Sequence, residues 1–141
     1  YGNVNVSKLA GNTVGPGGFI DIAQNARTVI FCGTFDTGGT SVEIGAGKLL
    51  IKANGRITKL VEEVAQITFS GPQALLHGQR VIYVTERGVF ALTKDGVALI
   101  EIAPGVDLKN DVLDRMGFAP QIDTVPKIMD VSLFFEDGDL P

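Results

Sequence analysis

Short apolar runs separated by glycine-rich breaks recur along the chain and predict a sheet-containing protein. The strongest run, Arg80-Val81-Ile82-Tyr83-Val84-Thr85, consists largely of β-branched and aromatic residues, which favour a strand. Runs at 88–92 and 97–102 predict two more strands, joined by a turn at 94–96. The run at 29–32 is apolar without interruption, the pattern of a strand covered on both faces.

A hairpin is predicted where two further runs, 41–44 and 48–52, flank Gly45-Ala46-Gly47. Directly after it, Asn54-Gly55 is a dipeptide typical of tight turns and predicts a second reversal. Residues 66–69 favour a short strand that ends before a proline-containing turn.

Three segments have helical patterns. Residues 19–26 predict a short amphipathic helix whose apolar face comprises Phe19, Ile20, Ile22 and Ala23. Residues 73–77 are long enough for a single turn. A helix at 108–116 follows Asp107, a favourable N-cap, and ends at Gly117.

The last part of the chain differs in character. Residues 118–141 contain Pro120, Pro126 and an increasing number of acidic residues, which predict an extended arm. Its apolar side chains need a surface to cover, on this domain or on a neighbouring part. The whole pattern predicts one α/β domain over residues 1–141, with an open mixed or parallel sheet flanked by helices and the arm at 118–141.

Composition narrows the function classes. A hydrophobic content of 45% and a charged content of 20% are typical of a folded domain. The net charge of −4 argues against nucleic acid and an anionic membrane as main partners. Because the sequence contains neither a bilayer-spanning apolar stretch nor an N-terminal signal, we expect a cytoplasmic protein with no membrane partner.

Single residues narrow the chemistry further. Cys32 is the single cysteine and lies in an apolar run, so we expect a buried small hydrophobe and no intrachain disulfide. With one histidine, one cysteine and no calcium-loop spacing, we expect no metal site. The chain begins at Tyr1 and enters strand-like sequence at once, so we expect it to be part of a longer polypeptide.

A glycine-rich loop, Gly15-Pro16-Gly17-Gly18, immediately precedes the first predicted helix. Glycine adopts positive φ and lets another molecule approach the backbone. Free N–H groups in such a loop can bind an anion or a carbonyl oxygen that gains negative charge. The loop can equally be a tight turn that lets helix and strand pack closely, and its spacing alone leaves both interpretations open.

Other candidates for chemistry are weaker. His77 is the single histidine, and Ser70 lies before a proline without the pattern of a nucleophile elbow. Glu62-Glu63 is typical of a solvated face. Glu86-Arg87, directly after the strongest predicted strand, is an ion pair that positions a loop or a functional pair, and the sequence leaves this open.

Several motifs together resemble the C-terminal part of a family I coenzyme A (CoA) transferase, most closely the fused-chain branch that handles acetate, propionate and similar acids. The resemblance covers nearly the whole chain, through Met129-Asp130. Its motifs are Gly2-Asn3-Val4-Asn5-Val6-Ser7, Gly15-Pro16-Gly17-Gly18-Phe19, Val29-Ile30-Phe31-Cys32-Gly33-Thr34-Phe35, Gln66-Ile67-Thr68-Phe69-Ser70-Gly71, Tyr83-Val84-Thr85-Glu86-Arg87 and Glu101-Ile102-Ala103-Pro104-Gly105-Val106-Asp107.

The resemblance implies an open α/β fold in two similar halves, with this chain in the second half. It implies that a glutamate attacks the acyl-CoA thioester, that the resulting anhydride becomes a glutamyl-CoA thioester, and that CoA passes to an acceptor carboxylate. By the same match Gly17 and Gly18, supported by Gly15, belong to the acyl/CoA pocket. The implied partners are acyl-CoA and short-chain carboxylates in a homo-oligomer of short-chain fatty acid and ketone body metabolism, with CoA as substrate and no other cofactor or metal.

One departure from the family pattern is important. The family nucleophile lies in a Ser-Glu-Asn/Ser-Gly motif, which is absent here, since Glu43 precedes Ile-Gly and Glu86 precedes Arg-Gly. We therefore expect no catalytic residue in this chain, an attacking glutamate in a preceding N-terminal part of the same protein, and no activity of the chain alone. A non-catalytic ligand-binding or assembly domain on the same scaffold is the alternative. A sugar-isomerase-like activity would need an acid/base pair that the sequence does not offer.

Overall fold

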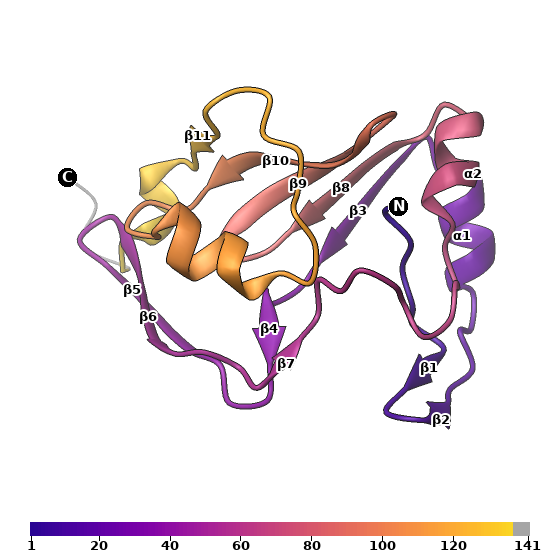
Figure 1. The fold of residues 1–141 in the computed structure, drawn as a ribbon, viewed down its shortest axis with the longest axis horizontal. Coiled ribbons are helices and arrows are strands. Elements are labelled where there is room, and N and C mark those ends of the chain that lie inside the picture. Colours follow the sequence, from indigo (N-terminus) through magenta and orange to yellow (C-terminus); the bar gives the residue numbers. More distant parts are fainter. Residues whose placement is uncertain (137–141) are drawn as a thin grey trace.

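The computed structural model describes residues 1–136, and its centre is a mixed sheet of five strands (Figure 1). The strands lie in the order β11-β10-β9-β8-β3. β3 and β8 are parallel, β8–β9 and β9–β10 are antiparallel, and β10–β11 is parallel. The sheet comprises β3 (Thr28–Cys32), β8 (Arg80–Val84), β9 (Gly88–Thr93), β10 (Gly96–Ile102) and β11 (Lys127–Ile128). This confirms the predicted mixed α/β fold.

Three small antiparallel pairs lie beside this sheet. The largest confirms the predicted hairpin and turns through Ala46 and Gly47, which both have positive φ. The pairs are β1 (Lys8–Leu9) with β2 (Asn12–Thr13), β4 (Asp36–Thr37) with β7 (Ile57–Thr58), and β5 (Ser41–Gly45) with β6 (Lys48–Ala53).

Helical segments are short and lie at the two ends of the sheet. α1 (Phe19–Asn25) and α2 (Gly71–Leu76) lie side by side at one end of the molecule, as Figure 1 shows, and pack against β3 and β8. A π-helical turn η1 (Leu108–Val112) and a 3₁₀ turn η2 (Leu113–Arg115) lie across the opposite half, and a second 3₁₀ turn, η3 (Val131–Phe134), follows β11. The predicted helices at 19–26 and 73–77 are confirmed. The one at 108–116 is instead this pair of irregular turns, although Asp107 caps it as predicted by accepting the Asn110 N–H (2.7 Å).

Apolar side chains form three buried clusters that hold these layers together. The first joins β9 and β10 to the η1 turn, the second joins β3 and β8 to α1 and α2, and the third joins β6 to η3. Their buried members are Phe35, Phe90, Val97, Leu99, Ile102 and Val112; Ala23, Val29, Phe69, Ala74 and Val81; and Leu49, Ala103, Met129 and Phe134.

The predicted double coverage of β3 is wrong for the described residues. Val29 is 8% exposed, whereas Ile30 is 58% exposed and Cys32 is also exposed. β3 lies at the edge of the sheet, and α1 and α2 cover one of its faces. The expectation of a buried Cys32 fails for the same reason. Ile22, placed on the apolar face of α1, is 73% exposed, so the prediction for this residue is also wrong.

One turn prediction and one strand prediction also need correction. After Asn54-Gly55 the chain does not fold back on β6, because β7 pairs with β4. A Cβ at Gly55 would lie 2.6 Å from the Thr37 N atom, so glycine serves close packing of two backbones here. The predicted strand at 66–69 is reduced to a single bridge between Phe69 and Val4.

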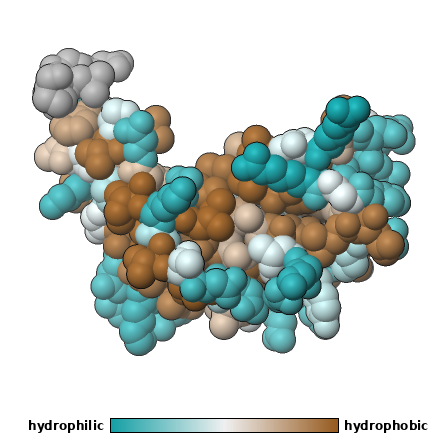
Figure 2. Space-filling model, turned by 90° about the horizontal axis from the view of Figure 1, so that it is seen from above, coloured by the Kyte–Doolittle hydropathy of each residue, from teal (hydrophilic) through white to brown (hydrophobic). Residues whose placement is uncertain are grey.

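Part of the described arm, from Gln121 to Ile128, runs alongside β10 in the same direction as that strand. Gln121 bridges to Ala98, β11 pairs with the end of β10, and Met129 and Phe134 are buried in the third cluster. Residues 137–141 of the arm lie outside the described residues. Other arm side chains are exposed, with Val125 at 91%. Figure 2 shows apolar residues gathered across the middle of one face of the molecule, more than isolated surface positions would give. Within residues 1–136, no helix combines the length and the apolar character that crossing a membrane requires.

Candidate functional site

The glycine loop at 15–18 leads directly into α1. The Phe19 N–H donates to the Pro16 carbonyl (3.1 Å), and the Ile22 N–H donates to the Gly18 carbonyl (3.0 Å). Gly17 has φ +56°, which requires glycine for an unstrained turn, whereas Gly18 has φ −80°. Gly15, Gly17 and Gly18 are all exposed.

Two backbone N–H groups of this loop have no partner in the described residues. Among residues 1–136, the N–H groups of Gly17 and Gly18 donate to no protein acceptor. A Cβ at Gly15 or Gly17 would meet nothing within 4 Å, and one at Gly18 would meet the flexible Ile22 Cδ1 at 3.6 Å. Close packing of helix and strand therefore does not explain these glycines. The arrangement can donate hydrogen bonds to an anionic oxygen, as the prediction for the three residues requires, and that role stays a prediction.

The loop lies at a favourable edge of the sheet. Ala26 and Arg27 alone connect α1 to β3, so the two elements run in opposite directions and the start of α1 lies toward the end of β3 (Figure 1). β3 and β8 are parallel, and both end at this edge, at Cys32 and Val84. Ligands of open α/β sheets bind at the carboxyl ends of parallel strands.

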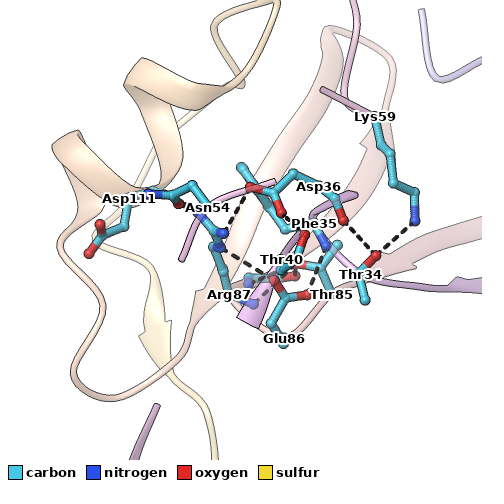
Figure 3. Close-up of polar contacts among 11 residues, drawn as sticks. Thr34, Phe35, Asp36, Thr40, Asn54, Lys59, Thr85, Glu86, Arg87 and Asp111 are labelled. Carbon is cyan, nitrogen blue, oxygen red and sulfur yellow. Dashed lines mark hydrogen bonds and ion pairs between the residues drawn. The ribbon is translucent and has the colours of Figure 1, made fainter. Parts of the chain in front are cut away.

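The most buried polar group near this edge is Arg87. Its side chain is fully buried, and its Nη2 lies 2.9 Å from Asp36 Oδ2 while its Nε lies 3.3 Å from Glu86 Oε1. The other carboxylate oxygen of Glu86 accepts the Phe35 N–H (2.7 Å). The guanidinium also stacks over the Phe35 ring at 4.8 Å from its centroid. Figure 3 shows these side chains converging from separate segments.

Arg87 also joins the cluster to two more distant segments. Its Nη1 donates to Asn54 Oδ1 (2.9 Å) and to the Asp111 carbonyl (3.0 Å). We refer to these groups (Phe35, Asp36, Asn54, Glu86, Arg87 and the Asp111 carbonyl) as the Arg87 cluster. In the described part of the chain, no buried side-chain nitrogen or oxygen lacks a partner. The Glu86–Arg87 ion pair therefore exists, and it fixes the loop at 33–36 after β3.

A polar surface continues from this cluster along the edge. The Thr34 hydroxyl donates to the Asp36 carbonyl (2.7 Å), and Lys59 Nζ lies 3.4 Å from the Thr34 hydroxyl (Figure 3). Two shallow hollows lie on the η2 side of the cluster. One is mainly apolar and includes Met116 and Phe118, and the other includes Asp36 and Arg115. Neither includes the glycine loop. The apolar hollow is lined by residues 113–122 alone, whereas the other brings residues 114–117 together with residues 36–61. No sequence pattern indicated either of them.

The remaining candidates do not form a catalytic group. Ser70 caps the start of α2 by accepting the Gln73 N–H (3.4 Å), while His77 lies at the other end of that helix and is exposed. Glu43 forms an exposed ion pair with Lys52 (3.0 Å). Glu62 and Glu63 are exposed, as their pattern predicts.

Known proteins similar in sequence to this chain are CoA-transferases. The chain is 51% identical over 136 residues to "Acetate CoA-transferase YdiF" of Escherichia coli O157:H7, covering 96% of this chain and 26% of that protein. It is 50% identical over 143 residues to "Caffeate CoA-transferase" of Acetobacterium woodii, covering 98% of this chain and 27% of that protein. No protein-family model matches the chain.

The backbone agrees with these relatives. A crystal structure of the E. coli O157:H7 acyl-CoA transferase YdiF, described as a thioester complex with CoA, superimposes with a TM-score of 0.93 over 96% of this chain and 26% of that one. The YdiF apoenzyme superimposes equally well. The chain thus spans about a quarter of the length of the curated relatives it matches. Sequence and backbone together show that this chain belongs to the CoA-transferase family.

Proposed function

We propose that this chain is part of an acyl-CoA:carboxylate CoA-transferase that moves CoA between short-chain acids through a glutamyl-CoA thioester. The observation that carries the proposal is the match of 96% of the chain, at 51% identity and a TM-score of 0.93, to a transferase described in a thioester complex with CoA. The names of the curated relatives, acetate and caffeate CoA-transferase, support carboxylic acids as acceptors.

The proposed reaction consists of balanced exchanges at one carbonyl. A glutamate carboxylate attacks the acyl-CoA carbonyl, the C–S bond breaks, and CoA leaves as a thiolate. The thiolate attacks the glutamyl carbonyl of the anhydride, which releases the first acid as its carboxylate and leaves glutamyl-CoA. The acceptor carboxylate then repeats these steps in reverse. Covalent catalysis divides a difficult exchange into easier ones.

The glycine loop is proposed to stabilise the oxyanion that forms in each attack. Preorganised N–H donors aimed at a developing oxyanion lower the barrier, and removing one donor costs about 10²- to 10³-fold in kcat. The exposed, unpaired N–H groups of Gly17 and Gly18 support this role, with Gly15 shaping the loop. The attacking glutamate is proposed to come from a preceding part of the same polypeptide, because neither Glu43 nor Glu86 fits the family motif.

The test is to trap the covalent intermediate. The full-length protein that contains this chain is incubated with an acyl-CoA, and its peptides are examined for a CoA adduct that hydroxylamine removes. We expect an adduct on a glutamate outside residues 1–141 and CoA exchange between acetate and propionate. The chain alone should give neither. An adduct within this chain, or a full-length protein that binds acyl-CoA without exchange, would refute the proposal and favour a non-catalytic binding domain.

Gly18→Val tests the loop itself. Valine is compatible with φ −80°, and its Cβ would meet Ile22 Cδ1 at 3.6 Å, so folding should be little affected. The added methyl groups would stand between the N–H groups and the substrate, and we expect CoA exchange to fall far more than stability. Gly45→Val is the matched control, because nothing lies within 4 Å of its Cβ position. Equal activity of the two variants would contradict the assignment of Gly17 and Gly18.

A further inference from the structure

The outer edge of β3 differs from other exposed surface of the molecule. β3 pairs with β8 on one side, and among residues 1–136 no strand pairs with its other side. The Arg80 N–H donates to the Arg27 carbonyl (3.0 Å), and the Gly33 N–H donates to the Val84 carbonyl (3.1 Å). These two bonds fix the alternation of the ladder, so the N–H and carbonyl groups of Thr28, Ile30 and Cys32 point away from β8.

This edge has none of the features that protect free strand edges in native proteins. Such edges are usually short, charged, bulged or interrupted by proline. β3 has five residues, none of them charged or proline, and its register with β8 is continuous. The opposite edge of the sheet shows the contrast, because β11 has two residues, one of them Lys127, and follows Pro126.

The side chains of β3 give an independent indication. Its sequence pattern is that of a strand covered on both faces, yet Ile30 is 58% exposed and Cys32 is exposed. Strands that belong to parallel arrangements are normally buried within a sheet. About three-quarters of the length of the curated relatives lies outside the part that this chain matches. That length is ample to supply one more strand.

We propose that the open edge of β3 pairs with a further β-strand from the remainder of the CoA-transferase polypeptide. This rests on the proposed function in that the chain works as part of a longer protein. The added strand accepts hydrogen bonds from the Ile30 and Cys32 N–H groups and covers the Ile30 side chain.

The pairing has a consequence for the site. The end of the added strand that lies beside Cys32 is adjacent to the loop at 33–36, which directly follows β3. Whichever direction it runs, the strand brings residues of the remaining polypeptide to the carboxyl end of β3, beside the loop that the Arg87 cluster holds.

Hydrogen exchange in the full-length protein tests the pairing directly. In a free edge, the outward amides of Ile30 and Cys32 exchange rapidly while those of Val29 and Phe31, which bond to β8, are protected. In a paired strand all four are protected. We expect the Ile30 and Cys32 amides to exchange at least about 100-fold more slowly than exposed loop amides. Rapid exchange at Ile30 and Cys32 beside protected Val29 and Phe31 would overturn the proposal.

A pair of variants gives a second measurement. Ile30 and Ile57 are both 58% exposed in this chain, so lysine at either should cost equally little if both face solvent. With β3 paired and covered, Ile30→Lys should lower the Tm of the full-length protein by several degrees more than Ile57→Lys. Equal shifts would count against the proposal. Both measurements report strand pairing whether or not CoA exchange is detected. Failure of the proposed function would appear in the trapping experiment instead, so the two failures can be told apart.

Discussion

Replacing Arg87 by methionine tests how the carboxyl edge of the sheet is held. Methionine keeps an aliphatic chain of similar length beside Phe35 but removes the charge and all five donors. The change deletes two ion pairs, with Asp36 and Glu86, and two hydrogen bonds, to Asn54 and the Asp111 carbonyl.

The size of the effect follows from burial. The Arg87 side chain is 0% exposed and that of Asp36 is 6% exposed, so the variant leaves a carboxylate in a dry site with the Thr40 hydroxyl as its remaining side-chain donor. Removing one partner of a buried ion pair costs about 3–5 kcal/mol, because the other charge is left uncompensated. A whole domain is stable by only about 5–15 kcal/mol, so Arg87→Met should be among the most destabilising substitutions in this chain.

Hydrogen exchange in the full-length protein measures this cost locally. Because each 1.4 kcal/mol corresponds to a factor of about ten, amides of β8 and β9 should exchange at least about 100-fold faster in Arg87→Met. Asp36→Asn in the same background removes the orphaned charge, and we expect it to restore about 1 kcal/mol or more.

The control is an ion pair with good geometry at the surface. Lys109 Nζ lies 2.7 Å from Asp114 Oδ2, a shorter contact than either ion pair of Arg87, but the two side chains are 74% and 49% exposed. Lys109→Met should therefore cost less than about 1 kcal/mol. Equal small effects for Arg87→Met and Lys109→Met would refute the reasoning that burial, rather than contact distance, sets the strength of the cluster.

Two further substitutions test single contacts. Gly55→Ala places a Cβ 2.6 Å from the Thr37 N atom, so it should destabilise the protein by about 1–3 kcal/mol, whereas Gly45→Ala, with open space, should be near neutral in the same thermal unfolding assay. Burial raises the pKa of Tyr83 above its ordinary value of 10.0, so stability from the neutral phenol is retained below about pH 10 and lost as the pH rises above it. Tyr83→Phe removes the hydrogen bond to the Gly2 carbonyl but should flatten this alkaline decline, which a series of Tm values between about pH 8 and 11 would measure. An unchanged decline would show that other groups cause it.

The sequence predicts best those elements whose structure depends on residues close together in the chain. The β8–β9–β10 meander follows from alternating β-branched and aromatic residues, and the β5–β6 hairpin follows from small residues that tolerate positive φ in its turn. Asp107 is a correct N-cap prediction because capping depends on a residue three positions away.

The Arg87 cluster shows where local information ends. The sequence signalled a Glu-Arg pair after the strongest strand, and that ion pair is present. Its other partners are 51, 33 and 24 residues away in the chain, and no local pattern specifies them. Gly55 fails in a related way, because an Asn-Gly pair predicts a hairpin while the contact that requires glycine comes from Thr37 on another segment.

The sequence predicts that β3 is covered on both faces, and the structure shows cover on one face. This error has a different origin from the two described above. A local pattern cannot distinguish cover supplied by nearby elements from cover supplied by a distant part of the polypeptide, since both select apolar residues on both faces. Val29 and Ile30 are both β-branched apolar residues, so the sequence predicts burial of both. α1 and α2 bury Val29, whereas Ile30 is 58% exposed. The exposed Ile30 side chain lies on a strand edge that has no protecting feature of its own. The backbone groups of the same residue point outward and, among residues 1–136, have no partner strand. The glycine loop, whose Gly17 and Gly18 N–H groups have no partner among the described residues, lies elsewhere, between β2 and α1. A single added strand would bond to the outward backbone groups of β3 and cover Ile30, so one contact would account for both the open backbone and the exposed side chain.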